Sequence, residues 1–168
     1  YKRQGEIMFA RILLVSLVSL FMQIGFFSGL LPEVTMPEFF VPMIIVMALA
    51  IGKKEAITLA AISGFVLDIY FRRAFGLRIL LFVAIAFVLG SMREKFTRRS
   101  IFVISVVTAV TGILYILSYG LGLMFLGIAT KTGAVFFNLF SFQIPIQIIL
   151  SIMYYMIFMR RRHRKVEY

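Results

Sequence analysis

The sequence predicts an all-α integral membrane protein that forms a single transmembrane domain over residues 1–168. Of its residues 62% are hydrophobic and only 15% are charged, and the mean hydropathy is +1.02. Soluble domains carry about 25% charged residues. The charged residues also gather in short clusters between long apolar runs. This alternation predicts six transmembrane helices.

The first three helices are predicted at residues 12–31, 36–54 and 55–71. The first is an uncharged run long enough to cross about 30 Å of hydrocarbon. Prolines and acids over residues 32–38 interrupt the pattern and end it. The next two runs are short and span only if their polar flanks are included. Three polar residues fall at helical spacing along the first helix, where they face protein or hydrogen-bond within the helix: Ser16, Ser19 and Gln23.

The last three helices are predicted at residues 75–92, 101–119 and 137–159. A glycine-rich apolar connection, residues 120–137, separates the last two. Pro145 is expected to kink the final helix, because proline lacks an N–H group and crowds the preceding turn. Aromatic residues near the ends of the spans are expected to be interface anchors, among them Phe71, Tyr115 and Tyr119.

Six spans place both termini on one side of the membrane, and the positive-inside rule makes that side cytoplasmic. Four basic residues fall on the outer side, Arg72, Arg73, Arg78 and Lys131, and the other 14 of the 18 fall on the inner side. A basic tail closes the chain and is interpreted as a membrane anchor that attracts anionic lipid: Arg160, Arg161, Arg162, Arg164 and Lys165. Because the positive charge is spread between apolar segments, no nucleic-acid partner is predicted.

No catalytic constellation is visible, so we predict no enzymatic activity, no cofactor and no metal site. The chain has no cysteine, and its one histidine, His163, lies in the basic tail. Glu33 and Glu38 form the closest carboxylate pair, in a proline-rich loop. They are expected to be solvated loop residues, with docking to a basic partner surface as the alternative.

The stretch from Gly64 to Gly76 is the main candidate site, because it places a carboxylate, Asp68, beside apolar sequence. Three hypotheses remain open for Asp68: an ion pair with a nearby arginine that fixes a helical hairpin, part of a partner-binding surface, or an ion or proton relay. Small residues let a second helix approach closely. The candidate residues, for the hairpin or for a partner's helix, are Ala60, Ala61, Gly64, Asp68, Arg72, Gly76 and Arg78.

The block from Phe40 to Gly90 resembles the rod shape-determining protein MreD family. The resemblance rests on the chain length, on the six apolar segments and on a Gly-x-x-x-Asp…Gly-Leu pattern. Its elements are Pro42, the basic turn Lys53-Lys54-Glu55, Gly64 through Asp68, Phe75-Gly76-Leu77 and Gly90, with Asn138 and Pro145 as weaker features of the last helix.

This resemblance implies a non-enzymatic membrane scaffold subunit of the bacterial cell-elongation (peptidoglycan synthesis) machinery, in the cytoplasmic (inner) membrane. It implies an MreC-like bitopic protein as the direct partner, with RodA, a class B penicillin-binding protein and MreB as indirect ones. It also implies a bundle like that of the S components of energy-coupling-factor transporters, which supplies an alternative function: binding of a vitamin as such an S component. Against this alternative, the first helix contains no Ala-x-x-x-Ala patch. The sequence leaves self-association open.

Overall fold

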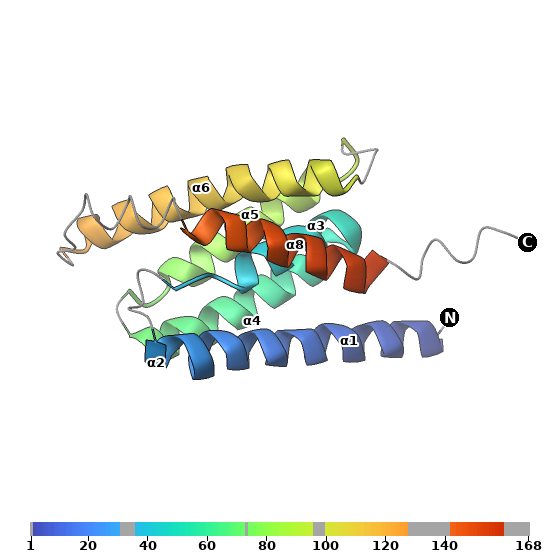
Figure 1. The fold of residues 1–168 in the computed structure, drawn as a ribbon, viewed down its shortest axis with the longest axis horizontal. Helices are drawn as coiled ribbons and strands as arrows, with labels where there is room; N and C mark the ends of the chain where they lie inside the picture. The colour runs from blue at the N-terminus through green and yellow to red at the C-terminus, as the bar shows by residue number, and fades with distance from the viewer. Residues whose placement is uncertain (1, 31–35, 73, 96–99, 128–141, 160–168) are drawn as a thin grey trace, which may run out of the picture.

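The computed structural model describes residues 2–30, 36–72, 74–95, 100–127 and 142–159, and all regular structure in these ranges is helical. One continuous helix comprises α1 (Lys2–Leu20), the π-helix η1 (Phe21–Phe27) and α2 (Ser28–Leu30). The remaining helices are α3 (Phe40–Ala50), α4 (Lys53–Phe71), α5 (Leu77–Ser91), α6 (Ile101–Phe125) and α8 (Ile144–Met159). They pack side by side as an elongated bundle (Figure 1).

Two helices are long and apolar enough to cross a membrane by length and composition, Met8–Leu30 and Ile101–Phe125. Three shorter apolar helices accompany them: Phe40–Ala50, Leu77–Ser91 and Ile144–Phe158. Helix α6 is longer than predicted, because Gly120 and Gly122 lie inside it. A Cβ atom on Gly122 would lie 2.8 Å from the Leu77 side chain, so this glycine allows α5 to pack closely rather than ending the helix.

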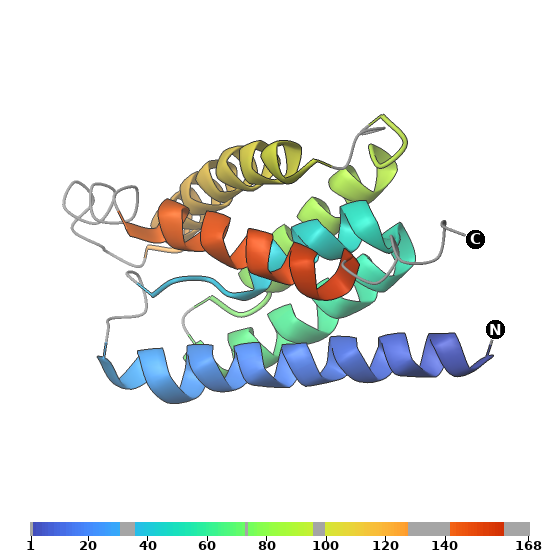
Figure 2. The same cartoon turned by 45° about the vertical axis from the view of Figure 1, so that its right-hand side comes forward.

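Helix α3 forms the centre of the bundle. Every residue from Met36 to Ala50 is buried, and α3 packs against α4, α5, α6 and α8. Figure 2 shows α1 and α6 on opposite sides of this centre. A short helix that is apolar on all sides is stable only when it is surrounded by other elements, and here the surrounding elements are the other helices.

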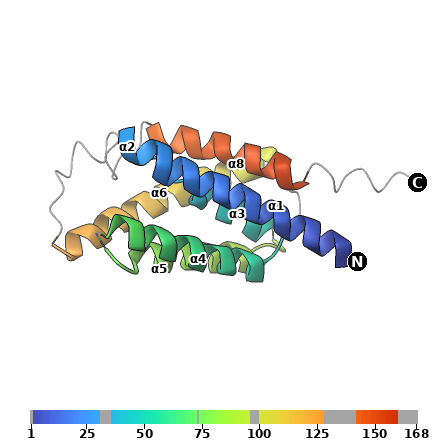
Figure 3. The same ribbon diagram turned by 90° about the horizontal axis from the view of Figure 1, so that it is seen from below.

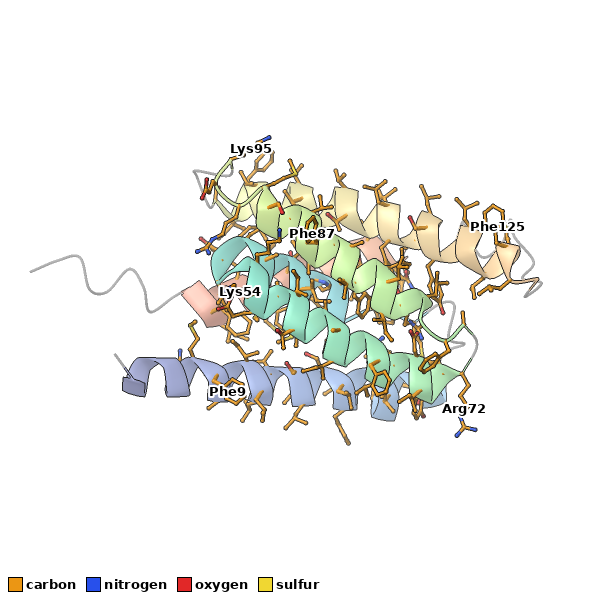
Figure 4. The ribbon with its side chains drawn as sticks, turned by 180° about the vertical axis from the view of Figure 1, so that it is seen from behind. Phe9, Lys54, Arg72, Phe87, Lys95 and Phe125 are labelled. Carbon is orange, nitrogen blue, oxygen red and sulfur yellow. The ribbon has the colours of Figure 1, made fainter. Side chains whose placement is uncertain are left out.

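Successive helices alternate in direction between two ends of the bundle. The start of α1, the end of α8, Lys54 and Lys95 lie at one end, which we call the Lys54 end, whereas Arg72 and Phe125 lie at the other, the Arg72 end (Figure 4). The views from the front and from below agree that α1 begins and α8 finishes at the same end (Figures 1 and 3). Successive described helices therefore run antiparallel to one another.

The outer surface is more apolar than parts of the interior. On the continuous helix formed by α1 and η1, the side chains of Phe9, Leu14 and Phe21 are 63–69% exposed, whereas those of Ser19 and Gln23 are 3% and 0% exposed. Ser19 bonds to both the Val15 carbonyl and the Tyr154 hydroxyl. Ser19 therefore meets both expectations, since it faces protein and also bonds within the helix. An apolar outside around a polar contact suits lipid rather than water.

Candidate functional site

The α4–α5 hairpin is held by a close backbone contact at Gly64. A Cβ atom built on Gly64 would lie 2.7 Å from the Cα atom of Ile79, on α5. Real Cβ atoms do not approach a backbone atom so closely, so only glycine fits here. Ala60, one turn earlier, is fully buried, and Ala61 is half-buried. The small-residue face of α4 is thus already occupied by the chain's own α5.

Asp68 caps the start of α5 from the neighbouring helix. Its Oδ2 atom accepts hydrogen bonds from the backbone N–H groups of Gly76, at 2.8 Å, and Ile79, at 3.3 Å. The first N–H groups of a helix lack partners within it, and a carboxylate is favoured there by the helix dipole. Gly76 has a φ of 92°, a left-handed conformation that glycine adopts without strain. Gly64, Asp68 and Gly76 therefore all stabilise the same hairpin between α4 and α5.

Arg72 contributes to this turn through its backbone. It has a φ of 51° and ends α4, with its N–H donating to the Asp68 carbonyl at 3.1 Å. Its side chain is exposed and points away from the bundle (Figure 4). The arginine that interacts electrostatically with the Asp68 carboxylate is Arg78, whereas Arg73, another of the predicted partners, lies outside the described residues.

Arg78 forms a buried ion pair with Glu38. The distance from Arg78 Nη2 to Glu38 Oε1 is 3.3 Å, and the two side chains are 2% and 7% exposed. The expectation that Glu38 is a solvated loop residue is therefore wrong. Proline-rich sequence around it suggested a surface loop, but this segment runs into the bundle and brings the carboxylate to α5. Glu33, the other member of that carboxylate pair, lies outside the described residues.

Two neutral side chains complete the shell of Glu38. Gln23 donates to Glu38 Oε2 at 2.7 Å and Tyr115 donates to Oε1 at 3.2 Å. Both side chains are buried, at 0% and 3% exposure. Burying a charge is costly unless it is paired and hydrogen-bonded. Here the carboxylate has partners from η1, α5 and α6, so the network joins segments that are distant in sequence.

Aromatic rings cover the Arg78 guanidinium. Its Cζ atom lies 4.6 Å from the ring centroid of Phe71 and 5.0 Å from that of Tyr119, both within cation–π range. The sequence assigned these rings and Tyr115 to an interfacial belt. The structure instead turns Tyr115 inward onto Glu38 and places Phe71 and Tyr119 over a buried arginine. The sequence signal that could have indicated this ion pair is Arg78, an arginine in apolar sequence 40 residues after Glu38.

Irregular backbone before α3 is satisfied by two glutamine side chains. Gln23 Oε1 accepts from the Phe39 N–H at 3.3 Å, and Gln143 Nε2 donates to the Met36 carbonyl. In a membrane, non-helical backbone is tolerated only where protein or water satisfies its polar groups. Gln23 therefore bonds both the charge and the backbone of this segment. Gln143 was not singled out in the sequence, where it is one polar residue in an apolar run.

The arrangement is that of an internal brace. Within the part of the chain that the structure describes, no three His, Asp or Glu residues gather to hold a metal ion. The polar groups around Glu38 and Asp68 bond one another or the backbone, so they fix helix positions. The predicted anchor, residues 160–165, lies outside the described ranges.

Comparison with known proteins identifies the family. No curated protein and no solved structure matches the chain. The family model described as rod shape-determining protein MreD matches residues 4–162, nearly the whole sequence. Together with the resemblance of the Gly64–Gly76 pattern, this match shows that the chain belongs to the MreD family of rod shape-determining proteins.

Proposed function

We propose that this protein is a non-enzymatic scaffold subunit of the cell-elongation machinery, which crosses the cytoplasmic membrane six times and holds an MreC-like bitopic protein. Membership of the MreD family, and with it a role in rod shape determination, carries this proposal. The buried brace around Glu38 supports the scaffold, because its polar groups bond one another between helices and so fix the helix positions. Through MreC, the scaffold would act with RodA, a class B penicillin-binding protein and MreB.

The proposed orientation places the Lys54 end in the cytoplasm. Lys53, Lys54, Arg93 and Lys95 gather at that end, around the α3–α4 connection and the end of α5. Cytoplasmic loops carry an excess of lysine and arginine. The start of α1 and the end of α8 lie at the same end, which supports cytoplasmic termini.

Cysteine labelling tests the orientation directly, because the chain contains no cysteine. Lys54→Cys and Arg72→Cys introduce single thiols at exposed positions at opposite ends. In intact spheroplasts, a membrane-impermeant maleimide should label Cys at position 72 and leave position 54 unlabelled until the cells are broken. The reverse pattern would invert the orientation, and labelling of both would overturn the six-span topology.

Co-purification tests the scaffold. The tagged chain would be extracted from native membranes in mild detergent, and bound proteins would be identified by mass spectrometry. Recovery of an MreC-like bitopic protein is the expected result. Recovery of paired cytoplasmic ATPases and a coupling membrane subunit would support the alternative, a vitamin-binding S component, and would overturn the scaffold.

The partner's position is also a proposal. Gly64 and Ala60 pack within the chain, so we assign Gly64, Asp68, Gly76 and Arg78 to the fold of the scaffold. Ala61 and Arg72 remain accessible to a partner on the outer face of α4. Ala61→Leu should weaken MreC-like co-purification and leave the unfolding midpoint unchanged. Normal recovery of the partner would exclude this face.

A further inference from the structure

An apolar groove lies between α5 and α6, with a volume of about 400 Å³. On α5 it is lined at helical spacing by Leu81, Ala84, Val88 and Met92, and on α6 by a matching row that includes Val106, Val110 and Leu114. This face of α5 differs from the face that contacts α4, on which Ile79 and Gly90 lie.

The groove runs along most of α5. From Leu81 to Met92 the chain rises by eleven residue steps, about 16 Å at 1.5 Å per residue. One end of the groove lies near the Lys54 end, where α5 finishes, and from there it extends along α5 towards the Arg72 end. The hydrocarbon of one membrane leaflet is about 15 Å thick, half of the whole core. The groove is therefore about as long as a single leaflet is thick.

Its cross-section suits a hydrocarbon chain better than a helix. A helix with side chains is about 10 Å wide, so 16 Å of it would fill about 1,250 Å³, more than the groove encloses. An extended acyl chain is much thinner. The lining is also almost entirely apolar, with polar side chains only towards the inner end, at Thr111, Tyr115 and Ser118.

Basic residues gather around the end of α5, where one end of the groove lies. Arg93 directly follows the lining residue Met92, and Lys95 is exposed two residues later. Lys53 approaches from α4, where its Nζ atom lies 2.8 Å from Ser91 Oγ. With Lys54, the described residues of this cluster include four basic side chains and two acids, Glu55 and Glu94. Clusters of this kind attract anionic headgroups.

We propose that this groove binds one acyl chain of an anionic phospholipid from the leaflet at the Lys54 end, with its phosphate beside Arg93 and Lys95. The proposal rests on the proposed membrane topology, which sets the Lys54 end at the headgroup level. This site lies on the surface of α5 and α6 and is separate from the basic tail.

Fluorescence quenching tests the acyl-chain site, because the chain contains no tryptophan. Leu114→Trp introduces a reporter at the rim of the groove, and Leu80→Trp is a control on α5, 65% exposed and outside the lining. Each variant is reconstituted in phosphatidylcholine vesicles that contain a small fraction of brominated phosphatidylglycerol or brominated phosphatidylcholine. At Leu114→Trp, the brominated phosphatidylglycerol should quench more strongly. At Leu80→Trp, both lipids should quench equally.

Equal quenching by both lipids at Leu114→Trp would overturn the lipid site alone. Quenching of neither reporter would overturn the membrane topology as well. Shielding of Leu114→Trp from both lipids once a bitopic partner is co-reconstituted would assign the groove to a protein helix and overturn the proposal.

Charge substitutions test the headgroup contact. In the Leu114→Trp background, Arg93→Gln and Lys95→Gln should each lower the preference for phosphatidylglycerol by about fivefold. Arg72→Gln, at the opposite end, is the matched control and should leave it unchanged. An unaltered preference in the Arg93→Gln/Lys95→Gln variant would overturn the assigned phosphate position.

Discussion

Helix α5 packs differently against two of its neighbours, α4 and α6. Against α4 it packs backbone to backbone, with Gly64 beneath Ile79 and Asp68 capping its first turn. Against α6 it leaves a groove of about 400 Å³ along most of its length. Helices in a membrane gain from close packing rather than from leaving water. A close contact therefore marks a fixed joint, and a groove beside it marks room for a separate molecule.

The largest expected effect is at the buried brace that locks the tight side. Arg78→Gln should lower stability by about 3–5 kcal/mol, because it leaves the Glu38 carboxylate buried without its charged partner. The measurement is the unfolding midpoint in detergent, with Arg72→Gln as the exposed control. The double variant Glu38→Gln/Arg78→Met should recover part of the loss. An undiminished loss in the double variant would show that the two residues act independently.

A smaller loss is expected from one methyl group at the joint. Gly64→Ala should cost about 1–3 kcal/mol, because the new Cβ atom forces α4 and α5 apart. The matched control is Gly29→Ala, where a Cβ atom would meet nothing within 4 Å. That control should be neutral or slightly stabilising. Equal midpoints for the two variants would contradict the close contact.

The cap on α5 separates the hypotheses for Asp68. Asp68→Ala should cost about 0.5–2 kcal/mol, the usual cost of losing a helix cap. Asp68→Asn keeps an oxygen that can accept from the N–H groups of Gly76 and Ile79, so it should retain most of the stability. If Asn destabilised as much as Ala, the charge itself would be needed, which would favour an ion pair or a relay over a cap.

The smallest effect is expected on the groove side of α5. Ala84→Leu adds three carbon atoms to an exposed lining residue. Its free energy of unfolding should stay within about 0.5 kcal/mol of that of the unsubstituted protein. This enlargement is larger than that of Gly64→Ala, yet it meets open space. A loss comparable to that at Gly64 would mean that α5 and α6 are as tightly joined as α4 and α5.

The sequence predicted the parts of this fold that depend on local pattern. Apolar runs located the helices, and the spacing of Gly64, Asp68 and Gly76 marked the hairpin. The family resemblance rested on the same residues, and the family match confirms it. One of the three hypotheses for Asp68 was an ion pair with an arginine, but its carboxylate accepts hydrogen bonds from backbone N–H groups. A sequence shows side-chain charges directly and shows unpaired helix ends only once the turn is known.

The brace around Glu38 could not be predicted in the same way. Its residues come from four separate segments, and local sequence gave each of them a different role. Prolines made Glu38 look like part of a loop, and a position near the end of a span made Tyr115 look like an interface anchor. Only the arrangement of helices around α3 brings them together. The extra length of α6 has a similar cause, since Gly122 accommodates Leu77 from another helix.

The complete burial of α3 has a consequence for how the protein is made. A segment of eleven helical residues is about 16 Å long, well short of the bilayer's hydrocarbon core. Its preceding backbone also needs Gln23, 16 residues before Phe39, and Gln143, 107 residues after Met36. During synthesis, α3 is therefore expected to leave the translocon joined to α4 as one unit. We expect α3 to reach its final position only after α8 has been synthesised, so the centre of the protein is completed last.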